Sequence, residues 1–326
     1  MKKLTIISNC IIGLTITASS FAQQGASKYE FVKTKAFNKT YNVGASDKLN
    51  IQNSFGKVEL YTWNKNEIKV DVAIEASSNM EPVAQKIIDG ITVSASQSGG
   101  EVAIKTSIGN INNKKGEKSS MKVDYVVYMP AGNPLKLSNE FGAITVPDLK
   151  GSTEIVSKFG SLKAGHLADV KKLEIEFGSA DIASINNGTT VIKYSAAIIG
   201  KLSGAVKLNV EFSSAVKIVI DNSLTSLDAK ASYATLNLKP AAGLAAAYSI
   251  HTSFGELKNR SGIKFTSDDD GDEHGPKFDH QYEGKTGNAN VSIKIKSDFG
   301  NIILGEATKE ELTEEENKAK KKTKTT

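Results

Sequence analysis

One stretch of the chain gathers the side chains best suited to binding a metal ion. It runs from about Thr266 to Asn288 and contains Asp268, Asp269, Asp270, Asp272, Glu273, His274, Asp279 and His280. Carboxylates at alternate positions, as at Asp268, Asp270 and Asp272, are the ligands that Ca²⁺ takes, and His274 could complete a transition-metal site. The spacing of an EF-hand loop and its final bidentate glutamate are missing. A solvated loop is the commoner structure for such a run, so we predict no metal and no cofactor, with these four residues as the only candidate ligands.

Catalysis of the kind found in carbohydrate-cleaving β-helices needs paired carboxylates, or a base beside a cation, that converge in a groove. In a repetitive chain such groups would recur at one position in neighbouring repeats. The recurring positions described below hold apolar, small or charge-alternating residues, and His166 and His251 have no acidic partner at the same position. The sequence therefore predicts no catalytic residues, and a carbohydrate-active enzyme is the least favoured function.

An aromatic residue followed by a small one recurs along most of the chain. The central copies are separated by 18, 18, 17, 18, 21 and 21 residues, and two outlying copies precede and follow them. A fixed period of about 20 residues is typical of a solenoid, in which each repeat is one coil. The nine copies are Phe55, Phe141, Phe159, Phe177, Tyr194, Phe212, Tyr233, Phe254 and Phe299.

The residues two, four and six positions before each aromatic are mostly apolar, as at Leu173 and Ile175 before Phe177. Such alternation predicts half-buried strands, and Gly, Asn and Asp then mark the turns that close each coil. Stacked strands lie about 4.8 Å apart, so the aromatic residues should form a ladder of packed rings. We interpret this ladder as filling the core, in preference to a platform for stacking sugars or bases.

The neighbours of each aromatic carry two further signals. The next residue is Gly, Ser or Ala, which indicates a limit on side-chain size rather than a backbone that only glycine can adopt. The preceding residue alternates in charge, and opposite charges on adjacent strands favour this register. That series is Glu140, Lys158, Glu176, Lys193 and Glu211.

The N-terminus predicts export. Two lysines precede an apolar run, and Ser20-Phe21-Ala22 resembles a signal-peptidase site, so residues 1–22 are interpreted as a signal peptide. The only cysteine, Cys10, lies inside it. The mature chain would therefore lack disulfides and cysteine-bound metal, and nothing later is apolar enough to cross a membrane. We expect a periplasmic, surface-bound or secreted protein.

Three further segments follow the predicted signal peptide. Residues 23–130 differ from the coils and are interpreted as β-rich strands that cap one end of the array, with a short helix near 81–89. Residues 131–305 form the β-solenoid array, interrupted by the acidic loop at 266–288 and completed by a last coil from Val291 to Leu304. Residues 306–326 are a charged tail that we expect to be disordered.

Taken together, these motifs resemble those of a family of bacterial envelope proteins known as putative adhesins. The resemblance extends from Phe55-Gly56 to Phe299-Gly300, although Ser or Ala replaces Gly in the middle coils. It implies an all-β fold, a right-handed single-stranded parallel β-helix, and a role without known catalytic residues.

The functional prediction is a non-enzymatic, adhesin-like binding or structural module whose partner is a macromolecule, either a protein or an envelope glycan. The main alternative is a periplasmic partner of a membrane signalling or envelope-stress system. Removal of Lys2 and Lys3 lowers the formal charge from +5 to +3, and no basic stripe with interleaved aromatics is present. Nucleic acid is therefore not an expected partner.

Overall fold

The structure is a computed structural model that describes residues 29–111, 114–268, 278–306 and 308. Within these residues the chain is all-β apart from one helix, α1 (Glu81–Gly90), so the expectation of an all-β fold with one short helix is confirmed. The strands are β1 (Phe31–Asn42), β2 (Lys48–Ser54), β3 (Val58–Trp63), β4 (Glu67–Ser78), β5 (Ile91–Ser98), β6 (Glu101–Ile108), β7 (Ser119–Pro130), β8 (Leu135–Glu140), β9 (Ile144–Val146), β10 (Leu149–Lys158), β11 (Ser161–Glu176), β12 (Ser179–Lys193), β13 (Ala196–Glu211), β14 (Ala215–Ser232), β15 (Thr235–Pro240), β16 (Ala246–Ser253), β17 (Leu257–Asn259), β18 (Phe265–Ser267), β19 (Asp279–Lys285), β20 (Val291–Asp298) and β21 (Asn301–Leu304).

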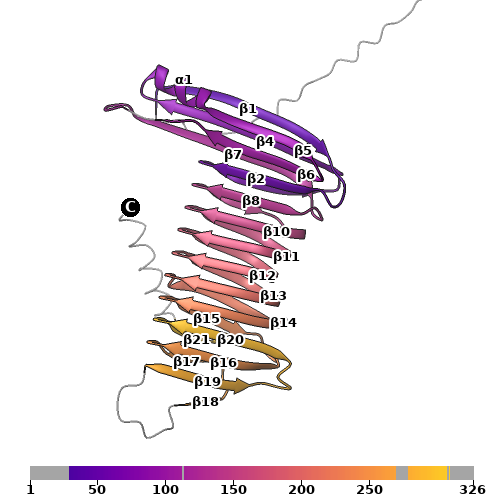
Figure 1. Cartoon of the computed structure of the whole chain (residues 1–326), viewed down its shortest axis with the longest axis vertical. Helices are drawn as coiled ribbons and strands as arrows, with labels where there is room; N and C mark the ends of the chain where they lie inside the picture. The colour runs from indigo at the N-terminus through magenta and orange to yellow at the C-terminus, as the bar shows by residue number, and fades with distance from the viewer. Residues whose placement is uncertain (1–28, 112–113, 269–277, 307, 309–326) are drawn as a thin grey trace, which may run out of the picture.

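From β8 to β15, strands pair in parallel with a segment about 17–21 residues further along the chain. Leu137 lies opposite Ile155, and Ile155 lies opposite Leu173. The chain therefore winds in stacked coils that form one large, mostly parallel sheet (Figure 1). In each coil, one strand segment ends just before an aromatic residue and a second begins two or three residues after it.

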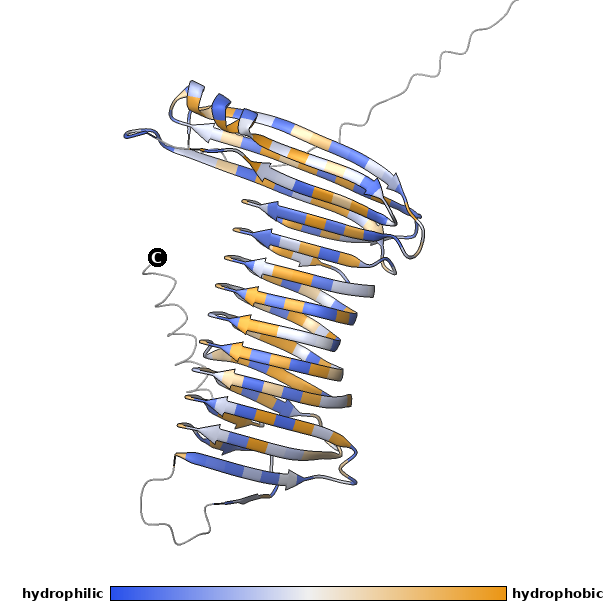
Figure 2. Ribbon diagram, viewed as in Figure 1, coloured by the Kyte–Doolittle hydropathy of each residue, from blue (hydrophilic) through white to orange (hydrophobic). Residues whose placement is uncertain are grey.

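These two segments form two layers of the sheet. Layer A contains the segments that end at an aromatic, including β2, β8, β10, β20 and β16. Layer B contains the segments that follow it, including β3, β9, β15 and β21, while β11 to β14 each contribute to both layers. Apolar side chains alternate with polar ones along the strands (Figure 2), and the core lies between the layers.

The coils are not stacked in the order of the sequence. The segment Val291 to Leu304 was expected to be the last coil, and this expectation is wrong. Within β20, Ile295 lies opposite Ala229 of β14 on one side and Ile250 of β16 on the other. Both edges of β20 are thus hydrogen-bonded in parallel pairs. The antiparallel strands β19 and β18 lie beyond β16 in layer A instead.

A different arrangement of strands lies at the other end of the array. In layer B, β1, β4 and β7 pair antiparallel, and β7 then pairs in parallel with β3. In layer A, β5 and β6 form an antiparallel pair, and β6 lies in parallel against β2. The helix α1 connects β4 to β5 and buries Ala84, Ile87 and Ile88.

Part of this N-terminal region extends beyond the edge at which the aromatic residues lie. The backbone N–H of Val123 donates to the carbonyl of Phe55, which places residue 123 of β7 level with that edge. Residues 119–122 of β7, with 75–78 of β4, therefore project about 13 Å past it at the usual rise per residue (Figure 1). We call these eight residues together with α1 the shelf.

A buried polar network joins the first coils. The Asn53 amide donates to Oδ1 of Asn139 at 3.0 Å, and the Asn139 amide donates to the carbonyl of Gly56 at 2.9 Å. Thr106 donates to Asn53 and also bonds the hydroxyl of Tyr125, both at 2.8 Å. Burial raises the pKa of Tyr125 to about 12. Because each member has a partner, the network can fix the register of these coils without leaving an unsatisfied group in the core.

Candidate functional site

A row of exposed aromatic rings runs along one edge of the molecule. Its members are 36% to 55% exposed, so the interpretation of these residues as core-filling is wrong. Neighbouring ring centroids lie 4.8–5.2 Å apart with interplanar angles of 2–22°. In spatial order, this aromatic stripe consists of Phe55, Phe141, Phe159, Phe177, Tyr194, Phe212, Tyr233, Phe299, Phe254 and Phe278.

The backbone explains why these rings lie outside the core. The nine aromatics of the repeat have φ between 50° and 61°, in the left-handed region. This conformation turns the chain sharply from layer A to layer B, and the alternation of inward and outward side chains stops there. Each such residue costs about 1–2 kcal/mol of conformational strain. Hydrogen bonds between coils hold the corner: the N–H groups of Phe141 and Phe159 donate to Lys158 and Glu176 at 3.0 Å.

The small residue after each ring is required by close packing between coils. A Cβ atom on Gly142, Gly160 or Gly178 would lie 1.9–2.0 Å from the carbonyl oxygen of the equivalent glycine in the preceding coil. None of these glycines has a positive φ, so the size limit predicted from the sequence is confirmed. In the middle coils a hydroxyl bonds the neighbouring backbone instead, and Ser195 Oγ accepts from the N–H of Gly178 at 3.0 Å.

A row of charged residues lies beside the stripe on layer A. Lys158 is 2.8 Å from Glu176, and Lys193 is 3.2 Å from Glu211, so the predicted opposite-sign pairing is confirmed. The hydrogen bond to Glu176 raises the pKa of Lys158 against a smaller opposing effect of burial. Small side chains flank the stripe on layer B: Ala143, Ser161, Ser179, Ala196 and Thr235. At the central rungs the rings therefore project between a row of paired opposite charges on one side and a surface of small side chains on the other.

The stacked rings expose their edges and cover their faces. A sugar or a base stacks on a ring face, and in this row each face between two members contacts the next ring. The geometry therefore favours a partner that contacts a long apolar ridge over one that inserts between rings. With about 200 Å² for each side chain and nearly half of it exposed, ten residues present roughly 900 Å² of apolar surface.

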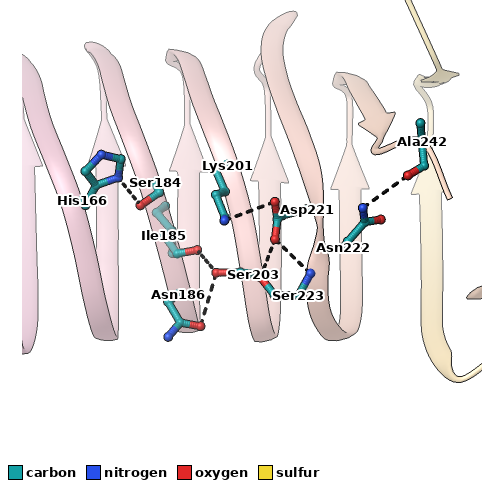
Figure 3. A network of polar contacts seen from close by, with 10 residues as sticks. All are labelled: His166, Ser184, Ile185, Asn186, Lys201, Ser203, Asp221, Asn222, Ser223 and Ala242. Atoms are coloured by element: carbon teal, nitrogen blue, oxygen red, sulfur yellow. Dashed lines mark hydrogen bonds and ion pairs between the residues drawn. The ribbon is translucent and has the colours of Figure 1, made fainter. Parts of the chain in front are cut away.

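Polar side chains at the opposite edge join neighbouring coils (Figure 3). His166 Nδ1 lies 2.8 Å from Ser184 Oγ, and Lys201 lies 3.2 Å from Asp221. The Asn222 amide donates to the carbonyl of Ala242 at 3.2 Å. Asp148 accepts from the backbone N–H of His166, which uses that carboxylate in a turn. These contacts stabilise the stacking of the turns.

The second histidine has an acidic neighbour that the sequence did not reveal. His251 Nε2 lies 3.2 Å from Ser253 Oγ and 3.7 Å from Asp279 Oδ1, and Ser253 donates to the same carboxylate. No acid lies at the same position on a neighbouring strand, as expected, because His251 faces Gln281 and Lys296; Asp279 reaches it from the position opposite Ser253. In a catalytic triad the acid and the nucleophile bind opposite ring nitrogens, whereas here both lie at Nε2. The cluster thus lacks the arrangement that activates a serine.

The acidic segment contributes little to the described surface. Asp268 Oδ1 accepts from the backbone N–H of Gln281 at 3.0 Å, so this carboxylate stabilises the end of the β18–β19 pair. Asp270, Asp272 and His274 lie outside the described residues. Across the part of the chain that the structure describes, no cluster of three or more His, Cys, Asp or Glu side chains could hold a metal ion.

Two aromatic features were missed from the sequence. Phe278 extends the stripe by stacking on Phe254 at 5.0 Å, but Asp follows it, so the aromatic–small motif does not identify it. On layer B, Tyr128 stacks against Tyr61 at 5.2 Å and Trp63 at 5.3 Å. Alternation in β3 and β7 places these rings on one outer face, and that was the available signal.

Comparisons with known proteins add little to this geometry. No family model matches the chain, and no curated protein matches it. Several solved structures match with low similarity, including the following two. The first is a putative cell adhesion protein from Clostridium sporogenes, with 12% identity and a TM-score of 0.26 over 84% of this chain and 100% of that one. The second is a putative adhesin from Bacteroides fragilis, with 13% identity and a TM-score of 0.30 over 83% of this chain and 97% of that one. Only the geometry of the chain itself therefore bears on its function. No helix among the described residues is long and apolar enough to cross a membrane.

Proposed function

We propose that this chain is a non-enzymatic, adhesin-like binding module of the bacterial cell envelope or the secreted fraction. Its fold in this proposal is a right-handed β-solenoid with the N-terminal strands as a cap, exported by the predicted signal peptide at residues 1–22. The observation that carries the proposal is the aromatic stripe. Soluble monomers rarely expose one apolar patch above about 300–600 Å², and patches of that size or larger mark interaction sites.

The cost of keeping the stripe supports a binding role. Each aromatic of the repeat occupies a left-handed conformation that Gly or Asn adopts more easily. Stacking between rings, worth about 0.5–1.5 kcal/mol for each pair, is of the same size as this strain. The stacking energy and the backbone strain therefore nearly cancel. An exposed apolar ring in every coil contributes little to the free energy of folding.

Substitution by histidine separates binding from folding. Histidine keeps a planar ring in the stack and tolerates the left-handed region, but gives the exposed edge polar atoms. We define the triple-His variant as Phe159→His, Phe177→His and Tyr194→His. The control variant is Ile198→Thr with Val219→Thr, because these side chains are exposed apolar residues on layer B outside the stripe.

The test is binding of the fluorescently labelled protein to intact producing cells and to isolated envelopes at pH 8. The wild type and the control variant should bind, and the triple-His variant should lose most of the signal while its circular dichroism is unchanged. Loss of binding after protease treatment of the envelopes indicates a protein partner, and loss of binding after muramidase treatment indicates a glycan. Equal binding of all three proteins would exclude the stripe as the site.

Protease accessibility on intact cells separates the two cellular roles. Digestion of the chain on whole cells supports adhesion at the surface. Protection on whole cells, with digestion after the outer membrane is permeabilised, supports the alternative of a periplasmic partner for a membrane signalling or envelope-stress system.

A further inference from the structure

We infer that the aromatic stripe binds a second copy of this chain, in an antiparallel two-fold dimer formed stripe against stripe. This inference rests on the proposed function and names its partner. Three features of the molecule carry it: the area and pitch of the stripe, the order of charges beside it, and the position of the shelf.

The area and the repeat distance of the stripe both suit a second copy. Each partner in a stable protein–protein interface buries about 800 Å², and the stripe alone offers roughly 900 Å². Its rungs recur every 4.8–5.2 Å, so a partner must match this spacing to keep contact along the whole row. A second copy has the same spacing, and every ring edge then meets an equivalent ring edge.

The residues beside the stripe on layer A form a charge row with one member at each rung. They face their neighbours in adjacent coils, as the strand register shows. In the order of the rings, the charge row consists of Ser54, Glu140, Lys158, Glu176, Lys193, Glu211, Ser232, Asp298, Ser253 and Asp279.

A two-fold axis perpendicular to the stripe brings the charge rows of the two copies together in opposite directions. If the axis passes between the rungs of Tyr194 and Phe212, all ten rungs overlap. Lys193 then faces Glu211 of the second copy, and Lys158 faces Asp298. The other charged members face serines, so no two like charges meet. An axis through the Tyr194 rung would instead place Lys193 against Lys193 of the second copy, so that two like charges would meet. The charge row therefore disfavours axes that pass through a rung, and among axes that pass between rungs the one between Tyr194 and Phe212 is selected because it overlaps all ten.

The shelf limits how far the second copy can slide along the stripe, and this limit agrees with the register of full overlap. It projects past the aromatic edge next to Phe55, where the stripe ends. A second copy that moved further in this direction would meet β7 and α1. Full overlap of the ten rungs therefore gives the largest contact that the shelf permits, with the end of each copy near Phe278 beneath the shelf of the other.

Sedimentation equilibrium of the mature chain at pH 8 tests the dimer. The wild type and the Ile198→Thr/Val219→Thr control should be dimers at micromolar concentration. The triple-His variant should raise the dissociation constant at least ~100-fold, because ring residues at the centre of an interface dominate its affinity. A wild-type protein that stays monomeric up to about 100 µM overturns the inference, as does a triple-His variant that dimerises as tightly as the wild type.

Cysteine pairs test the antiparallel arrangement, since the predicted mature chain has no cysteine. Ser179 and Thr235 flank the fourth and seventh rungs and should face each other between copies. An equimolar mixture of Ser179→Cys and Thr235→Cys should form a mixed disulfide dimer under mild oxidation. Each variant alone should form far less, because its two thiols would lie three rungs, about 14 Å, apart. Equal cross-linking in all three samples contradicts this arrangement.

The two proposals can fail separately. If the wild type is monomeric but the triple-His variant loses binding to envelopes, the self-association is wrong and the proposed function stands. If the wild type is a dimer and the monomeric triple-His variant still binds envelopes fully, the dimer stands and the stripe is not the adhesive site.

Discussion

Substitution of Gly160 by alanine tests the contact that sets the spacing of the coils at the aromatic edge. A Cβ atom added there would lie 2.0 Å from the carbonyl oxygen of Gly142 and 2.8 Å from its carbonyl carbon. Both atoms are backbone, so no side chain can rotate away. The neighbouring coils must separate by more than 1 Å at this corner to reach an ordinary contact of about 3.4 Å.

The expected cost has two parts. Overpacking of a tight contact costs about 1–3 kcal/mol. The movement also weakens hydrogen bonds between these two coils at the corner, such as the one that the N–H of Phe141 donates to the carbonyl of Lys158 at 3.0 Å, and each is worth about 1 kcal/mol. We therefore expect Gly160→Ala to lower the free energy of unfolding by about 2–4 kcal/mol, a large share of a typical stability.

Urea denaturation followed by circular dichroism measures this loss, with Gly132→Ala as the matched control. An added Cβ at Gly132 meets nothing within 4 Å, and its φ is not positive. The control should stay within about 0.5 kcal/mol of the wild type. A loss below about 0.5 kcal/mol for Gly160→Ala would refute the reasoning, because the coils would then tolerate a wider spacing.

Three further predictions concern stability. Phe177→Asn should be at least as stable as Phe177→Leu in urea denaturation, because both variants lose two ring contacts but only asparagine relieves the left-handed strain. At a buried core position the leucine variant would be the more stable of the two. Asn139→Ala should cost about 1–3 kcal/mol in the same assay, because it leaves the buried carbonyl of Gly56 without its donor. Hydrogen bonding to Lys48 lowers the pKa of Glu101 below 4.5. The stabilisation by the ionised Glu101 carboxylate should therefore be complete above pH 4.5 and should decline as the pH falls through its folded-state pKa. The Glu101→Gln variant should lack this part of the pH dependence of the urea midpoint.

Local sequence patterns predicted much of the coil. Alternation of apolar and polar residues identified inward positions such as Leu173 and Ile175, because a strand points successive side chains to opposite faces. The alternating charges predicted the register, because neighbours on adjacent strands meet directly. Glycine, serine or alanine after each aromatic of the repeat predicted a tight corner, because a larger side chain cannot approach the next coil.

The same patterns could not place the aromatic side chains. Alternation describes a strand, whereas Phe177 occupies a left-handed corner at which the chain changes direction and the alternation ends. The ring therefore points outward although the pattern of its strand places it inside. The acid beside His251 was missed for a related reason, since Asp279 reaches it from an antiparallel strand that follows a long insertion.

The sequence by itself determined the β-strand composition, the period of the coils and the inward face of each strand, since these depend on contacts between residues one to six positions apart or one period apart. Tertiary structure decided the stacking order and the exposure of the stripe. The placement of β20 between β14 and β16 depends on pairing between residues that are far more than one period apart in the sequence. Coils of similar pattern offer equivalent edges for such pairing, so the local pattern does not determine which edge β20 occupies. The stripe in turn becomes continuous only when that order brings Phe299 between Tyr233 and Phe254.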